Sequence, residues 1–174
     1  MKLKVLMMAA VLLSLNVCAE EVTPDPVTQE GMVNITWQGV DKYRDIKAVS
    51  EIQSRYEQRV FDVITKQLNK SVSKVFKANQ TLKMQVTDVD LAGDVRPTFG
   101  ATASHDIRLI TDLYPPRLTF SYQVLEDEKV IMVGDEKLKD MGFLQTTGVT
   151  SNQPLRYEAK MLDEWVKKKI APQL

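Results

Sequence analysis

The chain has 174 residues, of which 44% are hydrophobic and 26% charged, so it carries enough apolar material for one domain with its own core. Its 23 basic and 23 acidic residues cancel, and no basic field favours nucleic acid or an anionic membrane surface as a partner. Cys18 and His105 are the only residues of their kinds, which argues against the common zinc sites and against a disulfide framework.

Residues 1–19 have the pattern of a secretory signal peptide. Lys2 and Lys4 precede an apolar run, and Ala19 supplies a small residue for cleavage. The run is too short to span a bilayer and no later stretch is longer, so we expect a periplasmic chain with no transmembrane segment after cleavage. Lipidation of Cys18 is the less favoured alternative, because Val17 stands where the lipidation pattern needs a small residue.

Residues 20–32 contain two prolines and few large apolar side chains, which is typical of a flexible leader. We therefore expect a single domain over residues 33–174. Its first segment, residues 33–37, alternates Val33, Ile35 and Trp37 with polar residues and predicts a half-buried strand.

A long amphipathic helix is predicted over residues 49–76. Apolar residues recur four apart from Ile52 to Leu68 and form one face, which is far more often core than a partner surface. Ser50 is the expected N-cap, and the helix is expected to end near Asn79.

Four further strands or strand candidates follow. Residues 81–91 and 105–110 are expected strands, and residues 92–104 between them, rich in small residues, predict a loop long enough to suggest functional use. Residues 117–125 and 129–134 flank a charged turn and predict an antiparallel hairpin. A last helix is expected from about Pro154, with Lys167, Lys168 and Lys169 offsetting its dipole.

This order of elements favours the α+β class. We expect a largely antiparallel four- to five-stranded sheet with the long helix and the C-terminal helix packed on one face. The polar row of Thr119, Ser121 and Gln123 indicates that the other face is solvated.

The stretch VTDVDLAGD, residues 86–94, breaks its own alternation, because a straight strand would send Asp88 and Asp90 to the buried face. A bulge near Thr87 to Asp88 would turn both outward. A divalent cation site built from Asp88, Asp90 and Asp94 is a weaker alternative. The specific helix-loop-helix calcium motif fails, because Ala92 and Phe99 stand where oxygen ligands belong.

We take the region from these aspartates to the next strand as the candidate binding patch. It comprises Asp88, Asp90, Asp94, Arg96, His105 and Asp106. No catalytic residues are assigned, since adjacency in sequence works against a triad of Ser104, His105 and Asp106, and no phosphate-binding glycine loop or cofactor motif is present. A pair of carboxylates remains open, because such pairs are defined by distance in space.

Six segments together resemble a known family. They are VNITW (33–37), YRDI (43–46), VTDVDLAGD (86–94), HDIRLI (105–110), YPPRLTFSYQV (114–124) and PLRYEAKMLDEWV (154–166). In this order they resemble the family of domain of unknown function 3016, small exported proteins of Gram-negative bacteria. One departure is QGVDK, residues 38–42, where the family pattern has a proline. The resemblance implies export and a single domain, and it implies no activity.

Taken together, these features predict an exported periplasmic domain that binds an envelope protein or ligand without catalysing a reaction. The alternative is a carboxylate-based hydrolase of envelope material, with or without the assistance of a metal ion.

Overall fold

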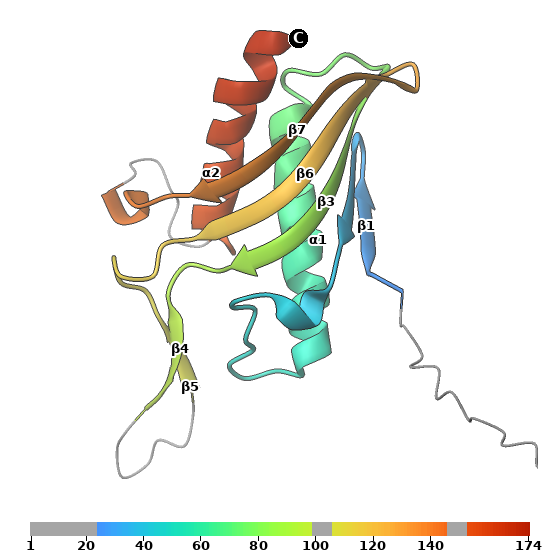
Figure 1. Ribbon diagram of the computed structural model, residues 1–174. Coiled ribbons are helices and arrows are strands. Elements are labelled where there is room, and N and C mark those ends of the chain that lie inside the picture. The colour runs from blue at the N-terminus through green and yellow to red at the C-terminus, as the bar shows by residue number, and fades with distance from the viewer. Residues whose placement is uncertain (1–23, 99–105, 146–152) are drawn as a thin grey trace, which may run out of the picture.

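The computed structural model describes residues 24–98, 106–145 and 153–174. The main sheet has five strands in the order β1-β2-β3-β6-β7, with β2 parallel to β3 and the other neighbours antiparallel. Both α-helices of these residues lie on one face of the sheet (Figure 1), which confirms the predicted α+β class. The strands are β1 (Val27–Glu30), β2 (Val33–Trp37), β3 (Gln80–Asp90), β4 (Asp94–Pro97), β5 (Asp106–Leu109), β6 (Arg117–Glu126) and β7 (Lys129–Lys139), and the α-helices are α1 (Gln53–Val72) and α2 (Arg156–Trp165).

Strand β1 corrects the expectation that residues 20–32 form a flexible leader. Thr28 is buried, and its hydroxyl accepts a hydrogen bond of 2.8 Å from Trp37 Nε1 and lies 2.6 Å from Thr65 Oγ1 on α1. The low apolar content of the segment hid this role, because the side chain that fixes it is a threonine. Part of that segment therefore belongs to the folded domain.

Helix α1 begins later and ends earlier than its apolar stripe predicts. The N-cap is Ile52 in place of Ser50, and no side chain caps the helix there. At the other end α1 stops at Val72, and Phe76 continues the buried face from the following turn. The buried stripe includes Val60, Ile64 and Leu68, as predicted.

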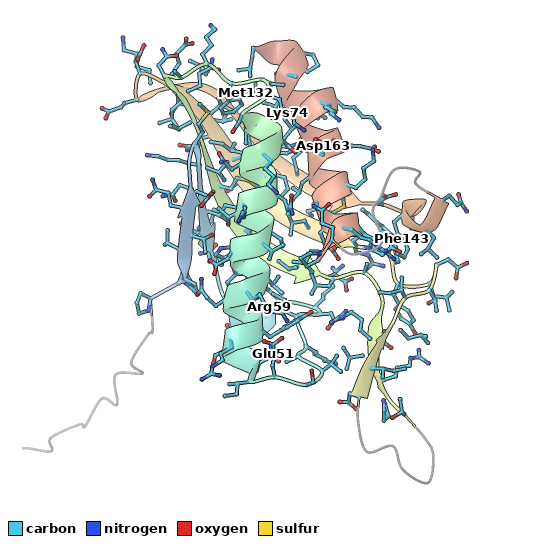
Figure 2. The ribbon with its side chains drawn as sticks, turned by 180° about the vertical axis from the view of Figure 1, so that it is seen from behind. Glu51, Arg59, Lys74, Met132, Phe143 and Asp163 are labelled. Carbon is cyan, nitrogen blue, oxygen red and sulfur yellow. The ribbon has the colours of Figure 1, made fainter. Side chains whose placement is uncertain are left out.

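Helix α2 begins at Arg156, two residues after Pro154, because Leu155 has a left-handed backbone (φ 50°) and acts as the N-cap. The helix continues through a short π-helix (Val166–Ile170) that carries the three lysines. Seen from the helix side, α1 and α2 lie side by side (Figure 2), and Ser71 Oγ donates a 2.8 Å hydrogen bond to Asp163 Oδ1 between them.

Strands β6 and β7 form the predicted hairpin, and β7 is longer than expected. The two-residue turn consists of Asp127 and Glu128, both with positive φ, a conformation whose twist suits adjacent antiparallel strands. Gly134 on β7 faces Tyr122, and a Cβ at this position would lie 2.8 Å from the tyrosine ring. The glycine therefore makes room for an aromatic side chain of the core.

The core fills the space between the sheet and the two helices. Trp37 of β2 stacks on Phe61 of α1 with ring centroids 4.2 Å apart. Near the other side of the sheet, Trp165 meets Phe120 and Tyr122 edge to face at 4.9 and 5.1 Å. Fully burying one such side chain contributes about 1.5–3 kcal/mol, so these clusters hold one helix to each half of the sheet.

Strands β4 and β5 form a separate two-stranded antiparallel ribbon that projects from the body (Figure 1). This corrects the prediction that residues 92–104 form a loop, because residues 94–97 of that segment pair with residues 106–109. The strand predicted at 105–110 is present, but its partner is this short ribbon.

Candidate functional site

The alternation in β3 is reset by a bulge at Thr87, as one alternative predicted. The pairing between β3 and β6 shifts between Val86 and Asp88, so that Val86 is opposite Phe120 and Asp88 is opposite Thr119. Val89 and Leu91 are consequently buried, and Asp88 and Asp90 turn to the other face, where both are partly exposed. The extra residue thus keeps two carboxylates out of the core.

Each aspartate of the stretch has its own arginine. Asp88 Oδ2 lies 3.2 Å from Arg44 Nε, and its Oδ1 accepts a hydrogen bond from the Arg44 backbone amide. Asp90 lies 3.6 Å from Arg117. In the part of the chain that the structure describes, no three His, Cys, Asp or Glu side chains are placed to hold a metal ion together. The three-aspartate cation site therefore receives no geometric support from these residues.

Asp94 and Arg96 lie together on β4. Arg96 Nε donates a 2.8 Å hydrogen bond to Asp94 Oδ2, its NH2 group bonds the Tyr114 hydroxyl, and its guanidinium lies 5.4 Å from the Tyr114 ring centroid. Asp106 is exposed on β5, opposite Pro97. His105 lies outside the described residues. The structure therefore brings Asp94, Arg96 and Asp106 onto the ribbon and leaves Asp88 and Asp90 at the end of β3.

A buried ion pair fastens the root of the ribbon to the body. Arg108 NH1 on β5 lies 2.7 Å from Asp45 Oδ2, and only 16% of the arginine side chain and 12% of the aspartate side chain are exposed. The same guanidinium donates to the backbone carbonyls of Lys47 and Ala92. Such a bidentate arginine fixes both position and orientation. The ribbon is therefore held rigidly at its base.

Glu158 joins α2 to the same place. Its carboxylate is buried and accepts a 2.7 Å hydrogen bond from the backbone amide of Ala92, the second residue after β3. Burial raises the pKa of the Glu158 carboxyl, although the Ala92 hydrogen bond and the charge of Arg108 act in the opposite direction. A cavity of about 240 Å³ lies between this carboxyl, Arg108 and the first turn of α2.

Sequence reasoning missed this buried cluster. Asp45 and Arg108 are 63 residues apart, and no local pattern in either segment predicts that they pair. Glu158 left a signal, because it lies four residues before the buried Leu162 and so falls on the apolar face of α2. An acid on an apolar stripe needs an internal partner, and this one has two nearby.

The chain enters the ribbon through Gly93. Its φ is +87°, and a Cβ here would lie 2.6 Å from the Leu109 carbonyl oxygen, so only glycine fits. The Gly93 amide donates a 2.9 Å hydrogen bond to the Tyr114 carbonyl. Gly93, which contributes to the apparent calcium motif in the sequence, is instead required for the turn into β4.

The ribbon and the turn after it expose large apolar side chains. Ile107 is 45% exposed, Leu109 42% and Leu113 75%, and Ile110 continues the group. Because Asp94 is opposite Leu109 and Arg96 is opposite Ile107, the ion pair and the apolar side chains occupy one face of the ribbon. This face, defined by Asp94, Arg96, Ile107 and Leu109, is called the ribbon face below.

Comparison with known proteins supports the resemblance noted in the sequence. Residues 31–168 match the family described as "Protein of unknown function (DUF3016)". The chain belongs to this family. No curated protein and no solved structure matches the chain.

The DUF3016 match spans β2 to the π-helix and so includes the ribbon and the buried cluster at its root. Strand β1 begins four residues before it. Among the described residues of this DUF3016 protein, no helix combines the length and the apolar character needed to cross a membrane.

Proposed function

We propose that this DUF3016 protein is an exported, periplasmic and non-enzymatic domain that binds a protein of the cell envelope through the ribbon face. The observation that carries the proposal is the exposure of Ile107 and Leu109 on a projecting element, with Leu113 exposed in the turn that follows it. Large apolar side chains that gather at a rim of charges are characteristic of protein interaction sites.

The rigid root of the ribbon supports this role. Arg108 and Asp45 are hydrogen-bonded to each other, Arg108 also donates to backbone carbonyls, and Glu158 accepts a hydrogen bond from the backbone amide of Ala92. A surface held in one conformation before it meets its partner loses less entropy on binding. The polar cluster thus serves as a support, and the apolar face that it carries is the contact surface.

Export is supported by the sequence of residues 1–19. If the chain is exported and cleaved after Ala19, osmotic shock releases it with periplasmic proteins, and Cys18→Ala leaves the release unchanged. A chain that stays with the cytoplasm at full length would contradict export. A chain that stays with the membrane, and is released by Cys18→Ala, would instead indicate lipidation.

The binding role can be tested by site-specific photo-crosslinking in cells. A photoreactive residue at Leu109 is expected to give a discrete adduct, and the same residue at Val27, which is 58% exposed on β1, is expected to give none. Ile107→Asp should abolish the Leu109 adduct without changing the melting temperature, because residue 107 is exposed. An adduct that survives Ile107→Asp, or equal adducts from both positions, would contradict the ribbon face as the binding site.

A carboxylate-based hydrolase is the second candidate, and one observation favours it. Glu158 is a buried acid with a raised pKa beside a cavity, which is the environment of many catalytic acids. In that case purified peptidoglycan sacculi would release soluble fragments with the wild-type protein and none with Glu158→Gln. If neither protein releases fragments, the hydrolase proposal for this material is wrong.

A further inference from the structure

Strand β7 is a long outer strand of the main sheet. In residues 24–98, 106–145 and 153–174 it pairs with β6 alone, and its other edge presents a row of backbone N–H and C=O groups over 11 residues. The opposite outer strand, β1, has only four residues. Val130, Ile131 and Val133 on β7 are 51%, 46% and 64% exposed. A strand edge of this length and composition can accept another strand.

A groove runs between β7 and α2 on the helix side of this edge. It has a volume of about 270 Å³ and an apolar floor of Leu138, Met161 and Trp165. Glu136, Glu164 and three lysines form its rim. A strand added to β7 would direct every second side chain into this groove.

The sequence of β7 complements itself in an antiparallel register over its regular second half. With a two-fold axis at Glu136, residue pairs are fixed by symmetry, so that Asp135 of each copy is opposite Lys137 of the other on the open face. Opposite charges at directly paired positions stabilise strand pairing. Neither Asp135 nor Lys137 has an ion pair with any other described residue, so both are available for this contact.

An axis at Met132 also sets Lys129 opposite Asp135, but that register runs through the irregularity of β7 at Ile131. The registers with axes nearer Glu136 lack a clean match of charges. An axis at Asp135 sets that residue against itself, an axis at Lys137 does the same for the lysine, and an axis at Gly134 brings Lys129 opposite Lys139. In the register centred at Glu136, the two Glu136 side chains meet on the helix side. There Lys169 Nζ lies 4.0 Å from the carboxylate in each copy and offsets their repulsion.

We propose that β7 pairs with β7 of a second copy about a two-fold axis at Glu136, which joins the two five-stranded sheets into one of ten strands. Because the axis is perpendicular to the sheet, both helix layers lie on the same side and the two grooves face each other. Leu138 of each copy is then opposite Gly134 of the other. The proposal is independent of the ribbon face.

The test measures the oligomeric state of the full chain, purified from the periplasm, by sedimentation velocity. Wild type is expected to be a dimer. Asp135→Lys and Lys137→Asp should each raise the dimer dissociation constant by about tenfold or more, since each turns two attractive pairs into repulsive ones. The double variant Asp135→Lys/Lys137→Asp restores both pairs and should return the wild-type value. Asp41→Lys, an exposed charge change away from β7, is the matched control and should have no effect.

Mixing distinguishes this register from general edge association. Equimolar Asp135→Lys and Lys137→Asp chains are expected to form a heterodimer, because residue 135 of each is then opposite a residue 137 of opposite charge. A wild-type monomer at concentrations up to about 100 μM would overturn the proposal. So would a double variant that stays as weak as the single ones, or a mixture that forms no heterodimer.

Discussion

At the scale of single residues, the buried carboxyl of Glu158 links stability to pH. Its pKa in the folded protein is raised by burial, so the folded state holds its proton more tightly than the unfolded chain. Its contribution to stability is complete below the unfolded pKa of a glutamate and is lost as the pH rises through the folded pKa. Above that window, the wild-type protein bears the cost of a buried charge.

We therefore expect Glu158→Gln to gain stability relative to wild type as the pH rises from about 4 to 7. The amide retains an oxygen that can accept the Ala92 hydrogen bond. Urea unfolding of both proteins across this range measures the difference, and Glu30→Gln, at an exposed site, is the control. A difference that shrinks with rising pH would contradict the assignment of a raised pKa.

Two aspartates allow a comparison of a buried with a more exposed ion pair. Asp45→Asn leaves Arg108 charged and buried, and we expect it to lower the free energy of unfolding by about 3 kcal/mol. Asp88→Asn affects a pair whose arginine side chain is 56% exposed, and we expect a loss below about 1 kcal/mol. Equal losses in denaturant unfolding would show that Asp45 and Arg108 do not fasten the ribbon.

Only part of the site could be predicted from the residues themselves. The bulge at Thr87 was among the alternatives because Val86 and Val89 could not both face the core on a straight strand. The pairing of Asp45 with Arg108 depends on how distant segments meet, and no local pattern encodes that meeting. The candidate patch therefore contains Asp106 but not Arg108, which lies two residues later on the same strand and belongs to the buried cluster.

At the scale of elements, α1 lacks a side-chain cap at its first residue. Ile52 is the N-cap with an extended backbone (φ −64°, ψ 130°), is 58% exposed, and is followed by a first turn without acids. We expect Ile52→Asp to raise the free energy of unfolding by about 1 kcal/mol, because the new carboxylate can accept a hydrogen bond from a free backbone N–H of the first turn. Ile52→Ala is the control in thermal unfolding. Equal melting temperatures for the two variants would show that a side-chain cap at residue 52 does not stabilise the helix.

The elements with strong periodicity were predicted well, whereas the four-residue strands β1 and β4 were missed. The stripe of α1 and the alternation of β6 each repeat several times, so the signal accumulates along the element. Strand β4 has four residues and ends in Pro97, and proline argues against a strand in any local reading. It is tolerated here because β4 has a partner on one side only.

At the scale of the whole molecule, the folded unit includes β1. Removing residues 24–32 would leave the Trp37 indole N–H without the acceptor that Thr28 provides and would expose one side of β2. A buried group that loses its partner costs about 1–3 kcal/mol, so we expect at least this loss of stability. Removing residues 1–23 is the control and should leave the melting temperature unchanged. A shorter chain as stable as the control would make β1 dispensable.

The class of the fold was predictable because it follows from the order and type of the strong elements. The order of the strands in the sheet was not, since it depends on β2 and β3 pairing in parallel across α1. Several strand orders would bury the same apolar faces, and the sequence pattern does not distinguish between them.

The tight turn at Asp127 and Glu128 bears on how fast the sheet assembles. A two-residue turn lets β6 and β7 pair within about 1–10 μs, the time scale of hairpin formation. Strands β2 and β3 are separated in the chain by α1, so their parallel pairing must wait until α1 has folded. Such non-local contacts slow folding. Strand β3 joins the two halves of the sheet, so its insertion between β2 and the hairpin is where we expect the folding rate of the chain to be set.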